Sequence, residues 1–281
     1  MSAVTLRLRA GAVEARKLPA FIRRDLLIML SYRAAFATDV LNIAVQALLF
    51  SFIGKLVDPA MLPAYGGTRA TYLEFAAIGV VLSLVCALLL HRVSTAVREE
   101  QLMGTFEALL ATPTSTATVQ AGSVAFDLLF VPLRMAAMLL VVALFFGLSF
   151  EPSGIVPALA VVAMFIPFVW GLGLVSAAAM VTFRRGAGLL AAGVSLLGIA
   201  SGAYFPLDLL PDWIQTMAEA NPVAITIDAV REALIGGGGW SAISSEAVLL
   251  PALSILALGS GALAFRAALA REHRRGTLGL Y

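Results

Sequence analysis

Long apolar runs separated by short polar segments dominate the chain. A helix of about 20 apolar residues crosses the hydrocarbon core of a bilayer, and runs of this kind predict six membrane spans. They cover residues 34–54, 75–97, 127–148, 157–183, 188–205 and 247–265. The runs are continuous and lack the two-residue alternation of membrane β-barrels. The sequence therefore predicts an all-α membrane protein with six transmembrane helices.

Composition and charge support the same class. Hydrophobic residues make up 60% of the 281 residues and charged residues 13%, with a mean hydropathy of +0.96. Soluble domains carry about 25% charged residues, so this chain has too few charges to cover a water-exposed surface. The net charge of +2 gives no basic field that would indicate nucleic-acid binding. Cys86 lies within an apolar run and is interpreted as a small membrane hydrophobe.

Basic residues are distributed unevenly among the polar segments. Cytoplasmic loops of membrane proteins are rich in lysine and arginine. With the N-terminus inside, only Lys55, Arg69 and Arg231 lie outside and Arg134 lies within a span, while all other basic residues are cytoplasmic. Both termini are therefore predicted to be cytoplasmic, in a multi-pass protein of the plasma membrane. The excess of arginine over lysine favours a bacterial source.

The N-terminal segment, residues 1–33, has a helical stripe of apolar residues before the first span. The stripe consists of Leu18, Phe21, Ile22, Leu26 and Met29. Basic side chains lie off this stripe, which predicts an interfacial helix with its apolar side in the inner leaflet. The alternative is that the first span begins early and is tilted. Residues 34–268 are predicted to form the membrane domain and residues 269–281 a cytoplasmic tail.

Two connections between spans have helical character of their own. Residues 98–113 form an amphipathic segment that Pro113 ends, and Gly104 permits close approach of a soluble partner. Residues 206–236, outside, predict two short helices. Asp208 is expected to cap the first, and Asn221 the second, with Pro222 at its first position and residues 236–239 ending it.

Both connections resemble those of type-2 ATP-binding-cassette (ABC) exporter permeases. The pattern R-E-E-x-x-x-G-T-x-E-x-L-L-x-T-P at residues 98–113 resembles the family's coupling helix, which follows the second span. The residues assigned to coupling are Arg98, Glu99, Glu100, Gly104, Thr105, Phe106, Glu107, Leu110 and Pro113. The residues that resemble the external re-entrant helices, between spans five and six, are Pro206, Pro211, Trp213, Asn221 and Pro222.

The resemblance covers nearly the whole chain and implies a transport subunit that is not an enzyme. Its partners would be a second permease copy, identical or related, two cytoplasmic ATPase subunits and membrane lipids. ATP and magnesium would be bound by the ATPase, because the chain has no Gly-x-x-x-x-Gly-Lys-Ser/Thr phosphate loop. Amphipathic, lipid-like, glycan-lipid or drug-like molecules are the substrates expected.

Polar residues within spans are costly and predict protein or water contacts. Asp39, Asn42 and Gln46 share one helical face of the first span, either along the translocation path or dimer seam, or at headgroup level with the amides bonding neighbouring helices. Span five carries a face of small residues that allows close helix packing. The resemblance places spans one and five near the interface between two copies. The small residues of span five are Ser195, Gly198 and Gly202.

Asp127 and Arg134 lie on one face of span three, but about 10.5 Å apart along the helix axis. We therefore expect partners on other helices, and a structural role is favoured over substrate contact. Pro132, Pro167 and Pro251 predict kinks.

An ion-driven secondary transporter is the alternative function, although no internal repeat supports it. An intramembrane enzyme lacks the necessary residues, since the only histidines, His91 and His273, lie near or beyond the cytoplasmic edge.

Overall fold

The computed structural model describes residues 16–31, 38, 41, 45, 48–58, 61–102, 114–148, 150–183, 193 and 195–275. Four helices in these ranges are long and apolar enough to cross a membrane, at Tyr72–Ala96, Thr118–Phe146, Pro152–Met180 and Glu246–Arg271. Each contains most of one predicted span, so the second, third, fourth and sixth are confirmed as apolar helices. The first and fifth lie partly outside the described residues, and six spans stay a prediction.

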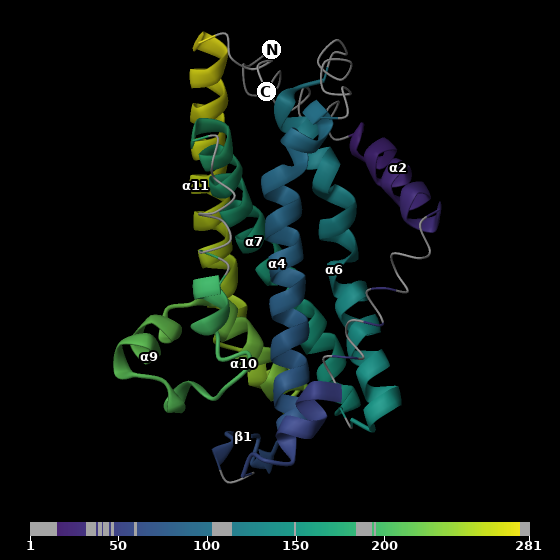
Figure 1. Ribbon diagram of the computed structural model, residues 1–281, viewed down its shortest axis with the longest axis vertical. Helices are drawn as coiled ribbons and strands as arrows, with labels where there is room; N and C mark the ends of the chain where they lie inside the picture. The colour runs from purple at the N-terminus through teal and green to yellow at the C-terminus, as the bar shows by residue number, and fades with distance from the viewer. Residues whose placement is uncertain are drawn as a thin grey trace.

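Four long helices form a bundle: α4 (Tyr72–Leu102), α6 (Thr116–Phe146), α7 (Ile155–Phe183) and α11 (Glu246–Arg275) (Figure 1). The most extensive packing joins α7 to α11, and α4 packs against both α6 and α7. Helix α4 therefore supplies much of the buried core. Its fully buried side chains include Phe75, Ile78, Leu82, Leu89 and Val93.

Shorter elements lie around this bundle. Helix α2 (Leu18–Ser31) packs on α6. Two short strands, β1 (Ala64–Tyr65) and β2 (Thr68–Arg69), pair as an antiparallel hairpin. Other short elements include η2 (Pro152–Gly154), η3 (Leu207–Leu209), α9 (Asp212–Glu219), α10 (Pro222–Leu234) and η4 (Ser241–Ile243). The hairpin, α9 and α10 gather at the end of the bundle opposite the C-terminal ends of α4 and α11, which separates the segments predicted outside from those predicted cytoplasmic (Figure 1).

Two predicted boundaries were wrong. The third span was expected to start at Asp127, but α6 starts at Thr116, where the Ser115 hydroxyl accepts a hydrogen bond from the Thr118 amide at 3.1 Å. Asp127 is tolerated inside the helix because a cation from α4 pairs with it. Helix α4 also continues through residues 98–102, so the predicted coupling segment begins as the end of α4 and not as a separate helix. Residues 103–113 lie outside the described residues.

The apolar stripe of α2 packs in part on α6. Phe21, Ile22 and Leu26 are half-buried, and α2 contacts α6. The Phe21 ring occupies the place that a side chain at Gly122 would need. Part of the stripe thus contacts α6, while Met29 at its end is exposed. The exposed apolar surface of α2 is its last full turn, residues 27–30, in which every side chain is 44–55% exposed.

Three of the four long helices contain a proline. Pro132 lies in α6, Pro167 in α7 and Pro251 in α11, while the sequence of α4 has none. Proline removes one backbone hydrogen bond within a helix. The backbone ladder of α4 therefore has no such gap.

Glycine brings α7 and α11 into backbone contact. A Cβ atom at Gly171 would overlap the carbonyl of Ala257, and one at Gly261 would overlap the carbonyl of Gly171. By contrast, a Cβ at Gly259 would meet no atom within 4 Å. The α7–α11 contact thus depends on the two facing glycines.

We expect Gly171→Ala to destabilise the protein by about 1–3 kcal/mol, because the new methyl group forces the two backbones apart. Gly259→Ala is the matched control and should leave stability unchanged or slightly higher, since alanine favours helix. Thermal unfolding in detergent, followed by tryptophan fluorescence, measures both. Equal melting temperatures for the two variants would contradict the close contact.

Candidate functional site: polar clusters at the two ends of helix α4

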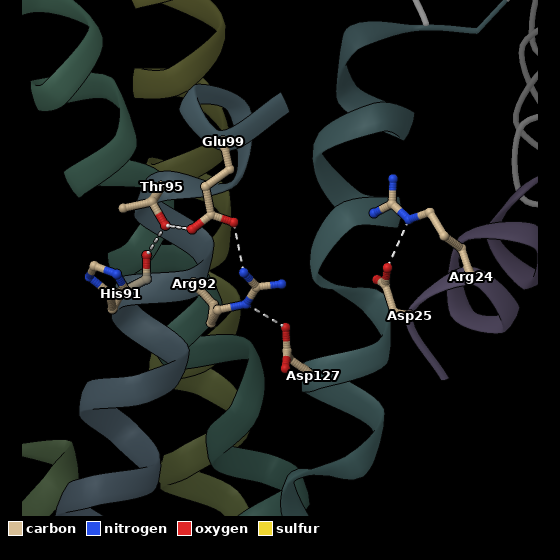
Figure 2. Close-up of polar contacts among 7 residues, drawn as sticks. All are labelled: Arg24, Asp25, His91, Arg92, Thr95, Glu99 and Asp127. Carbon is tan, nitrogen blue, oxygen red and sulfur yellow. Dashed lines mark hydrogen bonds and ion pairs between the residues drawn. The ribbon is translucent and has the colours of Figure 1, made fainter. Parts of the chain in front are cut away.

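An inner cluster of polar side chains surrounds Arg92, in the half of α4 that leads to the predicted coupling segment (Figure 2). Arg92 Nε donates to Asp127 Oδ2 of α6 at 2.9 Å, and Arg92 Nη1 donates to Glu99 Oε2 at 2.7 Å. The Asp127 side chain is 15% exposed and that of Arg92 34%. Arg92 thereby links the end of α4 to the middle of α6.

Helical spacing places the α4 members of the inner cluster on one face. Arg92 and Glu99 are seven residues apart, which is about two turns, and Thr95 lies between them. The Thr95 hydroxyl lies 2.8 Å from Glu99 Oε1 and 2.9 Å from the carbonyl oxygen of His91. Both Glu99 carboxylate oxygens therefore have partners, which fixes this side chain along the helix.

Helix α2 adds a further carboxylate to the inner cluster. Arg24 Nε donates to Asp25 Oδ1 at 2.8 Å, and the Asp25 side chain is only 11% exposed. Its other oxygen, Oδ2, is buried and has no hydrogen-bond partner among the described residues. The Arg24–Asp25 pair lies beside the Arg92 group, where α2 packs on α6 (Figure 2). The cluster thus holds charges from three helices: α2, α4 and α6.

The inner cluster contains part of the predicted coupling site. Glu99 lies in the last turns of α4, as do Arg98 and Glu100, whose side chains lie outside the described residues. Asp127 pairs with Arg92 on another helix, as expected, and Arg134 lies half-buried further along α6. The predicted residues outside the described part of the chain are Asp39, Asn42, Gln46, Gly104, Thr105, Phe106, Glu107, Leu110 and Pro113.

An outer cluster forms around Arg231 at the opposite end of α4. Arg231 belongs to α10 and is 1% exposed. Its guanidinium carbon lies 3.5 Å from the centroid of the Phe75 ring, and Nη2 donates to the Phe75 carbonyl at 2.9 Å. Nη2 also lies 3.0 Å from the Gly202 carbonyl oxygen and 3.3 Å from that of Ala203. These contacts join α10, α4 and residues 202–203.

Two further groups complete the charge balance of the outer cluster. Arg231 Nη1 donates to Asp228 Oδ1 at 3.2 Å, one helical turn away. The Tyr65 hydroxyl of the hairpin donates to the same oxygen at 3.5 Å. Burial raises the pKa of the Tyr65 phenol, so this group stays protonated at neutral pH and remains a donor. The Arg231 charge thus has a carboxylate and three backbone carbonyls around it, as a buried cation requires.

Asn221 connects the end of the predicted fifth span to α10. Its side-chain oxygen accepts a hydrogen bond from the Val223 amide at 3.0 Å, which caps α10. Its Nδ2 donates to the carbonyls of Ala200, at 2.9 Å, and Leu197, at 3.3 Å. The Asn221 side chain therefore bonds an unpaired backbone N–H at the start of α10 and two backbone carbonyls at the end of the preceding helical segment.

The two short helices predicted within residues 206–236 are present as α9 and α10, with one correction. Asn221 caps α10 and Pro222 is its first residue, as expected. Asp208 was expected to cap the first helix but lies inside η3, and Pro211 precedes α9 in the cap position. The turn differs because Pro206 and Pro211 each start a short segment with their fixed φ. Trp213 of α9 is 65% exposed.

Two of the three small residues of span five, Ser195 and Gly198, do not pack closely within the described part of this chain. A Cβ at Gly198 would meet no atom within 4 Å, and Ser195 is exposed. Gly202 has a different role. Its φ of +64° is a conformation that favours glycine, and it directs the Gly202 carbonyl to Arg231.

Sequence reasoning missed the two arginines at the centres of these clusters. Arg231 was counted only as an outside charge and Arg92 only as a cytoplasmic one. The available signals were their spacings, three residues from Asp228 to Arg231 and seven from Arg92 to Glu99. Their partners in other elements, Phe75 and Asp127, are distant in sequence and no local pattern indicates them.

Comparison with known families identifies the chain. A family model described as the ABC-2 type transporter matches residues 16–235, which is most of the chain. The chain belongs to the ABC-2 type transporter family. This match confirms the resemblance found in the sequence. No curated protein matches the chain.

The ABC-2 domain is the membrane permease domain of type-2 ABC transporters, and it is a transport subunit. Together with the apolar helices, it makes this chain a multi-pass membrane protein. The matched range runs from the start of α2 to the end of α10 and contains both polar clusters. Helix α11 lies beyond the matched range but packs along α7.

Proposed function

We propose that the chain is the permease subunit of a bacterial ABC exporter. Two permease copies, identical or related, form the translocation path, and two cytoplasmic ATPase subunits bind ATP and magnesium and drive it. Both termini lie in the cytoplasm. The observation that carries this proposal is the ABC-2 match across residues 16–235, which includes the whole coupling pattern at residues 98–113.

The inner cluster supports a mechanism for transmitting movement. Glu99 is bonded to Arg92, and Arg92 to Asp127 of α6, so a displacement of the segment after Leu102 pulls on two membrane helices. Asp25 extends the same charge network to α2. ATP binding supplies the energy by binding one of two pre-existing states more tightly. We infer that the substrate is amphipathic and lipid-like, glycan-lipid or drug-like, because the exposed helix faces are so apolar.

Reconstitution tests the proposal against its alternative. The chain is placed in liposomes with and without an ABC ATPase subunit that co-purifies with it, and efflux of a fluorescent lipid analogue and a cationic dye is followed. Efflux that requires both ATPase and ATP supports the exporter. Efflux by the chain alone, driven by a proton or sodium gradient, would establish the ion-driven secondary transporter instead.

We expect Glu100→Lys and Gly104→Trp to uncouple the complex, because both change the segment proposed to dock on the ATPase. Basal ATP hydrolysis should persist while efflux per ATP falls about tenfold, a typical size for coupling between two sites. Glu219→Lys makes the same charge change at the exposed end of α9 and should leave efflux unaltered. Normal efflux in both coupling variants would refute this docking site.

A further inference from the structure

The outer cluster joins three segments that are far apart in sequence. Arg231 uses Nε and Nη2 on the Phe75 carbonyl, at 3.2 and 2.9 Å, and Nη2 also reaches the carbonyls of residues 202 and 203. The partners are backbone atoms on α4 and on the segment before η3. Only a planar guanidinium presents several donors in a fixed fork, so lysine could not reproduce this arrangement.

The backbone around Arg231 is shaped to admit it. A Cβ at Gly79 of α4 would overlap the Ala203 carbonyl and lie 2.6 Å from Arg231 Nη2. The absence of that side chain lets residue 203 approach α4. The Tyr72 hydroxyl adds a second link by donating to the Tyr204 carbonyl at 3.2 Å. The outer end of α4, residues 202–204 and α10 are therefore held together by bonds within a dry contact.

We infer that Arg231 is a positioning residue that fastens α10 to the outer end of α4, so that the two move as one body. A displacement that starts at Glu99 is then delivered to the external helices through α4. The joint itself stays closed during transport. The part of this inference that concerns transport rests on the proposed function.

Electron paramagnetic resonance tests the joint in the chain alone. Cys86 is the only cysteine, so a Cys86→Ala background accepts spin labels at Leu88→Cys on α4 and Glu232→Cys on α10. Both positions are half-buried. In nanodiscs we expect one narrow distance distribution with Arg231 present. Arg231→Met and Arg231→Lys should lose it and give a broad distribution, because α10 is no longer bonded to the Phe75 carbonyl.

Matched variants keep this test decisive. Arg266→Met removes an exposed arginine at the other end of the bundle and should preserve the narrow distance. Tyr72→Phe removes only the second link and should broaden the distance distribution less than Arg231→Lys does. If Arg231→Met fails to fold, Arg231→Lys and Tyr72→Phe provide the test. An unchanged distribution in Arg231→Lys and Tyr72→Phe would overturn the inference.

Measurements on the assembled complex distinguish a failure of the Arg231 joint from a failure of the proposed function. With the ATPase present, the distance should stay the same in the nucleotide-free and ATP–vanadate states, and Arg231→Lys should lower efflux per ATP about tenfold with basal hydrolysis kept. A distance that changes between states would overturn the inference. If no ATPase assembles with the chain, the proposed function fails, while the nanodisc result on the joint still stands.

Discussion

Arg92→Met is expected to destabilise the protein and to uncouple transport, because it leaves the Glu99 and Asp127 carboxylates without the cation that bonds to both. Removing one partner of a buried ion pair costs about 3–5 kcal/mol. Arg92 is 34% exposed, so water screens part of this penalty, and we expect a loss of about 2 kcal/mol. Thermal unfolding and efflux per ATP measure the two effects.

Three variants separate the charge of Arg92 from its geometry. Arg266→Met, an exposed arginine on α11, should change neither quantity. Arg92→Lys keeps the charge but cannot bond two carboxylates in a fork, so it should retain most stability and lose coupling. Combining Arg92→Met with Asp127→Asn should restore part of the stability, because one uncompensated carboxylate is gone. A strictly additive double variant would show that the two residues do not interact.

Asn221→Asp should destabilise the protein although aspartate is as good a helix cap as asparagine. The carboxylate can still accept the Val223 amide, but it has no donor for the carbonyls of Leu197 and Ala200. Asn221 is buried, and each carbonyl left unsatisfied in such a place costs about 1–3 kcal/mol. A negative charge beside these carbonyl oxygens adds repulsion.

The comparison with Asn221→Ala identifies which role of the side chain matters. Alanine loses the cap, worth about 1 kcal/mol, as well as the two carbonyl bonds. If the link to residues 197–200 dominates, both variants unfold at similarly reduced temperatures. If Asn221→Asp instead has the same melting temperature as the unaltered protein, the residue acts only as a cap of α10. The link to residues 197–200 then contributes nothing to stability.

Local signals account for what the sequence predicted well. The cap, the first proline and the glycine run of α10 act within a few residues of one another, and the apolar length of a span is likewise a local property. The glycine run explains why α10 ends at Leu234, just before Gly236. The start of α6 failed because a charge was taken as a boundary, whereas a partner on another helix holds Asp127 inside the span.

The residues that were missed depend on contacts between distant segments. Arg231 bonds to Phe75 across 156 residues, and Gly171 faces Ala257 on α11. Ser195 and Gly198 of span five, which the sequence did mark, make no close helix contact within the described residues, whereas the α7–α11 pair, which has no marked motif, does. Small residues permit close approach, but only the fold determines which of them meet a neighbour.

The proline-free backbone of α4 gives this helix the properties of a lever. Its 31 residues extend over about 46 Å, so a tilt of about 5° at one end carries the other end through about 4 Å. Its neighbours α6 and α7 each have a proline at which they can bend around it. A tilt of about 5° imposed near Glu99 would thus become a movement of about 3 Å at Phe75, which lies about 36 Å away along the helix.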